Sequence, residues 1–194
     1  MSTDPHSPRR LGRWTPRFPR DTAPRPTPTP LGVVLLGALI IMVGVRLLYL
    51  HVPAGRDEAG YLIVGTHWDD STSLYGPYWV DRPPLLIWIM QLVGDLRTLR
   101  IIGLLSGVAM VLGVARAASL AGGARAAGWA AGAAALFASA GWLGIARTNG
   151  EMLAAPCVAW GLALTVQAIV RPGRRGWLLA LGAGVLAAGA ALIK

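Results

Sequence analysis

The apolar residues of this chain fall in long uninterrupted runs separated by short polar segments, unlike the alternation of a soluble core. A membrane-spanning helix needs about 20 such residues to cross a hydrocarbon layer about 30 Å thick. Five runs come near that length: Leu31–Val52, Leu99–Leu120, Ala126–Ala146, Met152–Val170 and Trp177–Ile193. The pattern therefore predicts an all-α polytopic membrane protein with about five transmembrane helices.

A further apolar run, Pro84–Gly94, is too short to span a bilayer. It begins directly after Pro83 and is followed by Asp95, so we expect a helix that lies in the interface or packs against other helices. This run falls within residues 53–98, which form the first outer loop of the predicted arrangement.

The charged residues indicate how the spans are oriented. With five spans and a cytoplasmic N-terminus, Arg125 and the basic cluster at 171–175 lie inside, as the positive-inside rule requires. Most acidic residues then lie outside: Asp57, Glu58, Asp69, Asp70, Asp81, Asp95 and Glu151. Arg46 and Arg116 lie near span ends, where a long side chain is expected to snorkel to the headgroups. We predict a multi-pass protein of a bacterial inner membrane.

Composition separates a tail, residues 1–30, from the apolar domain, residues 31–194. The chain is 54% hydrophobic and 14% charged, with a net charge of +9, and the tail is rich in arginine and proline. Such a segment cannot bury a core, so we expect it to be disordered. A basic segment beside a membrane span is commoner than a nucleic-acid-binding arm, and no nucleic-acid partner is expected. Cys157 is the single cysteine, which excludes an intramolecular disulfide.

Candidate chemistry gathers in the outer loop, as four polar or aromatic clusters. In order they are Arg56-Asp57-Glu58, His67-Trp68-Asp69-Asp70, Tyr75-Gly76-Pro77-Tyr78-Trp79 and Asp81-Arg82-Pro83-Pro84-Leu85. Each cluster alone fits a helix cap, an aromatic belt or a headgroup contact. Together they suit a site for a lipid phosphate and a sugar, because arginine binds phosphate and a carboxylate accepts a proton. His67, Asp69 and Asp70 are an alternative divalent-metal site.

The order of several landmarks carries a family resemblance. They are Asp57-Glu58 after the first span, Arg82-Pro83-Pro84-Leu85 before the second, Arg100 leading into it, Arg147 shortly before Glu151, and Lys194 ending the fifth span. This order resembles the N-terminal part of the polyprenyl-phosphate-sugar-dependent glycosyltransferases of the C-type membrane fold. The branch concerned is family 39, which contains the protein mannosyltransferases and aminoarabinose transferases. Arg82 stands where that family usually has lysine, and Glu151 where aspartate is common.

The resemblance implies sugar transfer, with inversion, from a polyprenyl-phosphate donor to a protein, lipid or wall-polysaccharide acceptor at the outer membrane face. Asp57 would be the general base, with Glu58 beside it orienting groups or holding a divalent metal. Arg82, Arg56 and Arg147 would bind the donor phosphate, and Glu151, Asp81 and Lys194 would support them. The likeness covers only the first part of a typical family member, so we expect the domain to be incomplete at its C-terminus. The alternatives are a non-catalytic transporter half or assembly subunit, or an inactive fragment.

Overall fold

The computed structural model describes residues 31–67, 82–140, 147–171 and 173–194, and all regular secondary structure in these ranges is helical. Four helices in these ranges are long and apolar enough to cross a membrane. They are α1 (Leu31–Leu48, continued by the short 3-10 helix η1, Tyr49–His51), α4 (Leu96–Ser139), α5 (Gly150–Val170) and α6 (Arg174–Ile193). The chain is therefore an all-α membrane protein by the length and composition of its helices.

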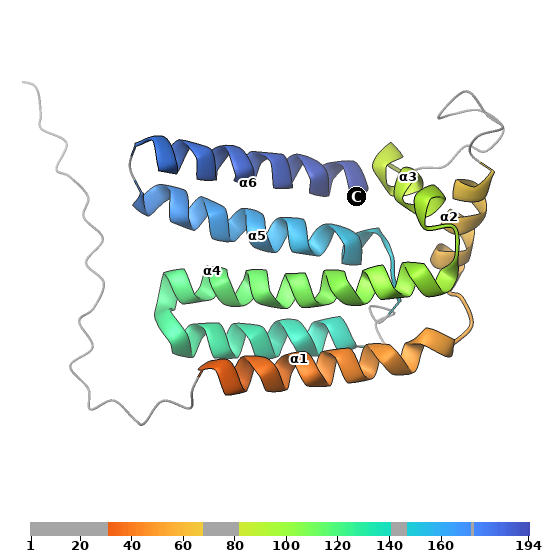
Figure 1. Ribbon diagram of the computed structural model, residues 1–194, viewed down its shortest axis with the longest axis horizontal. Helices are drawn as coiled ribbons and strands as arrows, with labels where there is room; N and C mark the ends of the chain where they lie inside the picture. Colours follow the sequence, from red (N-terminus) through yellow and green to blue (C-terminus); the bar gives the residue numbers. More distant parts are fainter. Residues whose placement is uncertain (1–30, 68–81, 141–146, 172) are drawn as a thin grey trace, which may run out of the picture.

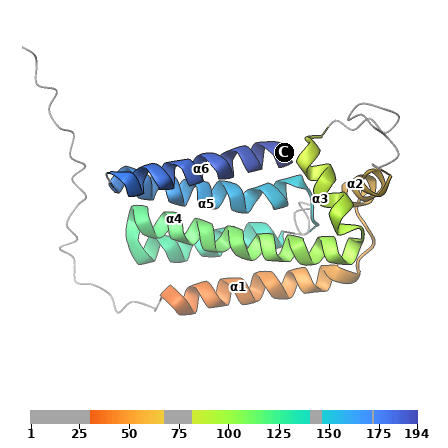
Figure 2. The ribbon, with the colours of Figure 1, turned by 45° about the horizontal axis from the view of Figure 1, so that its top comes forward.

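The helix α4 doubles back on itself. Gly123 has φ 75° and ψ −167°, a backbone conformation that is not helical and that a side chain would disfavour. Residues 96–122 and 124–139 consequently form two limbs that lie side by side in Figures 1 and 2. The predicted runs Leu99–Leu120 and Ala126–Ala146 correspond to these limbs as far as Ala140, where the described part stops. The five predicted spans include the two limbs as separate spans, whereas both limbs belong to the single helix α4 among the four helices given above.

The long helices pack in chain order, with α1 against α4, α4 against α5, and α5 against α6. Figure 2 shows α1 on the far side of α4 from α5 and α6. One core cluster joins α1, both limbs of α4 and the start of α5, and most of its residues are alanine or methionine: Ala38, Met42, Val111, Ala115, Ala131, Ala135, Ala138 and Met152. Small side chains let helix axes approach closely, which is the usual basis of helix association where lipid replaces water.

Two shorter helices, α2 (Arg56–Thr66) and α3 (Pro84–Val93), cover one end of the bundle (Figure 1). The expected short helix in the outer loop is confirmed as α3, which begins at Pro84 and ends at Gly94 in the left-handed conformation. Its residues Leu86, Ile87 and Met90 are buried, so it packs against other helices. The two helices meet closely at Gly65, where a Cβ would lie 2.7 Å from the backbone nitrogen of Gln91.

Two details differ from the sequence-based expectation. The helix α4 begins at Leu96, inside the predicted outer loop, because the Asp95 side chain accepts hydrogen bonds from the N–H groups of Arg97 and Thr98. The expectation that Arg46 snorkels to the headgroups is wrong. Its side chain is 3% exposed, and it donates a hydrogen bond to the sulfur of Met152 inside the bundle.

Candidate functional site

A buried ion pair organises the end of the bundle that carries α2 and α3. Arg100, in the first turns of α4, contacts Glu58 of α2, with 2.9 Å between Nη2 and Oε2. The two side chains are 4% and 1% exposed. A buried charge is costly unless it is paired and hydrogen-bonded, so the surrounding contacts decide whether this pair can hold.

The Arg100 guanidinium uses every one of its N–H donors. Nε and Nη2 donate to the two carboxylate oxygens of Glu58, and Nη2 also donates to the carbonyl of Pro53. Nη1 donates to the carbonyls of Tyr49 and Val52. These carbonyls belong to the stretch where the chain leaves α1, and the Tyr49 carbonyl also accepts a hydrogen bond from the Val52 N–H at the end of η1. Arg100 therefore satisfies the backbone at the point where regular helix ends.

The Glu58 carboxylate is equally engaged. Oε1 accepts a hydrogen bond from the Thr148 N–H and Oε2 accepts one from the Gly55 N–H, each at 2.9 Å, in addition to those from Arg100. Burial alone would raise the pKa of Glu58, but the hydrogen bonds from Arg100, Gly55 and Thr148 outweigh burial and hold that pKa below its ordinary value. The carboxylate is thus an anion that ties α2 to α4 and to the segment before α5.

This network changes the role expected of Glu58. Each of its oxygens already accepts two hydrogen bonds, which uses the accepting capacity of a carboxylate. Glu58 therefore has no free acceptor position for the divalent metal that it was expected to hold, and its role here is to orient the groups bonded to it. It fixes the first turn of α2, and Asp57, the preceding residue, is left exposed on that turn.

Arg56 and Arg147 lie near Asp57. Arg56 is the first residue of α2 and is exposed. Arg147 packs its side chain on Gly55, where a Cβ would lie 2.7 Å from Arg147 Cδ. Because Gly55 has no side chain, the Arg147 side chain can approach the backbone two residues before Asp57. The structure thus leaves the Asp57 carboxylate exposed on the first turn of α2, with Arg56 next to it in the chain and Arg147 packed on Gly55.

A second group of predicted residues gathers where α3, α5 and α6 meet. Lys194 forms an ion pair with Glu151, and Arg82 is close enough to Glu151 to interact with it electrostatically. Arg82 Nε donates to the Tyr61 hydroxyl at 2.6 Å, and its guanidinium carbon lies 5.7 Å from the centre of the Tyr61 ring. The fold therefore brings together Arg82, Glu151 and Lys194, which are far apart in the sequence. Asp81 lies outside the described residues.

The described residues do not supply a complete set of ligands for the possible metal site. No group of three or more His, Cys, Asp or Glu side chains that could hold a metal ion occurs among those residues. His67 is exposed at the end of α2, while Asp69 and Asp70 fall outside the described ranges. The divalent-metal hypothesis therefore stays a prediction from the sequence.

Three residues of this region were missed as site residues by the sequence reasoning: Arg100, Thr148 and Tyr61. Arg100 could have been found from the sequence as a charge inside an apolar run, a position that requires a partner. Thr148 contributes a backbone N–H, and Tyr61 a hydroxyl from a helix of mixed composition, so neither left a signal in the sequence. No protein-family model, curated protein or solved structure matches this chain.

Proposed function

We propose that this chain is a glycosyltransferase domain that transfers a sugar from a polyprenyl-phosphate donor to an acceptor at the outer face of a bacterial inner membrane. The proposal includes a cytoplasmic N-terminus, five spans and a partial C-type fold. One observation carries it most directly: the Glu58–Arg100 pair holds the first turn of α2 so that Asp57 is exposed at the helix start, where Arg147 packs on Gly55. The order of sequence landmarks supplies the choice of reaction.

In this proposal Asp57 accepts the proton of the acceptor hydroxyl as that oxygen attacks the anomeric carbon of the sugar. The bond between the anomeric carbon and the phosphate oxygen breaks, its electron pair leaves with polyprenyl phosphate, and the configuration inverts. Arg82, Arg56 and Arg147 stabilise the phosphate charge, because a guanidinium can donate two parallel hydrogen bonds to it. Lys194 keeps Glu151 paired, which limits the competition of that carboxylate for Arg82.

The test is transfer of radiolabelled sugar from a panel of polyprenyl-phosphate sugars in membranes containing the full chain. Asp57→Asn should lower incorporation by about 10²- to 10⁴-fold, the usual contribution of a general base, without changing the unfolding midpoint in detergent. Asp95→Asn is the matched control, since Asp95 is also an exposed carboxylate at a helix start and should leave transfer unchanged. Full activity of Asp57→Asn would overturn the assignment of the base.

A non-catalytic role, as a transporter half or an assembly subunit, is favoured by one specific observation. Arg46 is buried inside the bundle, near Met152 of α5 and Gly107 of α4. An ionisable side chain enclosed by membrane helices often marks a pathway. This reading predicts that no donor gives incorporation with the folded chain, and that Arg46→Met alters binding or transport of a partner.

A further inference from the structure

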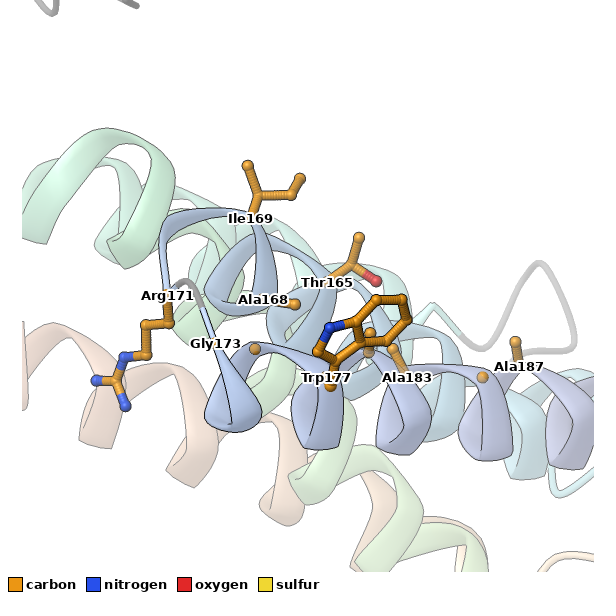
Figure 3. A pocket seen from close by; sticks show the side chains of 11 residues that line it. Thr165, Ala168, Ile169, Arg171, Gly173, Trp177, Ala183 and Ala187 are labelled. Atoms are coloured by element: carbon orange, nitrogen blue, oxygen red, sulfur yellow. The ribbon is translucent and has the colours of Figure 1, made fainter.

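A groove runs between α5 and α6 (Figure 3). It lies near the turn that joins these helices, at the end of the bundle opposite to α2 and α3 in Figure 1. Its volume is about 620 Å³, and it is lined mainly by apolar groups, among them Ile169, Trp177, Ala183, Gly184 and Ala187. This size lies within the usual range of small-molecule sites, about 300–1,000 Å³. The groove is remote from Asp57, so an occupant here is independent of the proposed transfer reaction.

The groove exists because α6 carries glycine and alanine on the side that faces α5. Gly176 is buried at the turn between the two helices, and a Cβ there would collide with the carbonyl oxygen of Arg171. The close turn fixes the two helices together at this end, while the small residues further along α6 leave space between them. At Gly184 a Cβ would meet nothing within 4 Å.

Positive charge stands at the end of this groove. Arg171 lies at the turn, where Figure 3 shows its side chain extending from the end of the groove, and Arg174 and Arg175 begin α6. All three are exposed. Trp177 is 79% exposed and forms part of the groove lining, and an indole ring is well suited to the boundary between acyl chains and headgroups.

We propose that the groove between α5 and α6 binds one anionic phospholipid. An acyl chain lies along the small apolar residues, and the lipid phosphate is held by Arg171, Arg174 and Arg175. Basic pockets between membrane helices are suited to such headgroups, because the cations stand at the depth of the phosphates and the helices supply an apolar channel beneath. The charge complementarity selects an anionic lipid over a zwitterionic one.

The same arginines argue against a second copy of the chain as the occupant. Two copies inserted in the same direction would bring their arginine clusters to the same membrane surface. If both copies met at this groove, the clusters would face each other across a short distance, and like charges repel. An anionic lipid instead neutralises the cluster and fills the apolar space at once.

The test uses native mass spectrometry of the delipidated full chain in detergent, with phosphatidylglycerol or phosphatidylcholine added separately. The wild-type chain should retain one phosphatidylglycerol at least about tenfold more tightly than phosphatidylcholine, given the contribution of each arginine near a phosphate. The triple variant Arg171→Gln, Arg174→Gln, Arg175→Gln should lose this preference. The double variant Arg116→Gln, Arg125→Gln, which removes exposed arginines of α4, should keep it.

A second pair of variants tests the apolar part of the groove without changing charge. Gly184→Leu places a side chain in the groove and should weaken retention of phosphatidylglycerol about tenfold. Gly189→Leu is the matched control, because Gly189 lies on the same helix, has equally open space around it and does not line the groove. Equal retention of both lipids by the wild-type chain would overturn the proposal. So would a wild-type dimer that Gly184→Leu, but not Gly189→Leu, dissociates.

Discussion

The two ends of this helical bundle differ in their arginines: among the described residues, buried arginines occur only at the end with α2 and α3, beside exposed ones such as Arg56 and Arg97. At the end with α2 and α3, Arg100 is buried and surrounded by acceptors, and Arg46 is buried in the last turn of α1. At the other end, the arginines are exposed: Arg116, Arg125, Arg171, Arg174 and Arg175. The difference follows the backbone. Tight turns at Gly123 and Gly173 join the helices at one end, whereas the other end contains non-helical chain whose carbonyls need donors.

The two buried arginines have different partners: Arg100 donates to backbone carbonyls and to Glu58, whereas Arg46 donates to the sulfur of Met152. Arg100 joins the end of α1, the start of α2 and the start of α4, and through Glu58 it reaches the segment before α5. An apolar side chain in place of Arg100 could not connect these four segments in the same way, because it would donate no hydrogen bonds to the backbone carbonyls. The end with the buried pair therefore adds polar contacts to its apolar core, which includes Leu86, Met90 and Leu99.

Removing the buried cation should have the largest effect on stability. Arg100→Ala leaves Glu58 as an uncompensated buried charge and removes the Arg100 hydrogen bonds to three carbonyls, which should lower the free energy of unfolding by about 3–5 kcal/mol. This change in the free energy of unfolding is measured by denaturant titration in detergent, with circular dichroism as the probe of unfolding. Arg97→Ala, one turn earlier on α4 and exposed, should change stability by less than about 0.5 kcal/mol. Equal effects of the two variants would remove the distinction between buried and exposed arginines.

Acid should break the same contact. The folded pKa of Glu58 is below its ordinary value of 4.5, so its stabilising contribution is present above about pH 4.5 and is lost as the pH falls through the folded pKa. Thermal melts of the wild-type chain between pH 7 and pH 3 should show this loss. Glu58→Gln should be less stable at pH 7 and should show a smaller further loss on acidification. The same acid sensitivity in both proteins would mean that other carboxylates, such as Asp95, dominate.

The smallest expected effect concerns the contact between α2 and α3. Gly65→Ala places a Cβ 2.7 Å from Gln91 N and 2.9 Å from the carbonyl carbon of Met90, and backbone atoms cannot yield as a side chain can. It should cost about 1–3 kcal/mol by overpacking. Gly60→Ala on the same helix meets open space and should stabilise by up to about 1 kcal/mol, since glycine disfavours a helix interior. A stabilising Gly65→Ala would show that α2 and α3 do not need this close approach.

The sequence by itself determined most of the helical framework. Apolar runs of the required length specify α1, both limbs of α4, α5 and α6 to within a few residues, and Pro84 and Gly94 mark the ends of α3. These features are local, because a helix satisfies its own backbone and its hydrophobicity follows from the residues that compose it. That Asp57, Arg82, Arg147 and Glu151 form one candidate site stays a prediction from the order of landmarks in the chain.

Only the tertiary structure decided which charged residues are exposed, and so open to a substrate, and which are buried and hold the fold together. Asp57 and Glu58 are adjacent in sequence and chemically alike, yet one is exposed and the other 1% exposed with every acceptor position used. Arg46 and Arg116 looked equivalent, but Arg46 is buried and Arg116 is exposed. The partners that make the difference, such as Thr148 for Glu58, lie up to 90 residues away. Such contacts depend on how helices pack, which a local pattern does not specify.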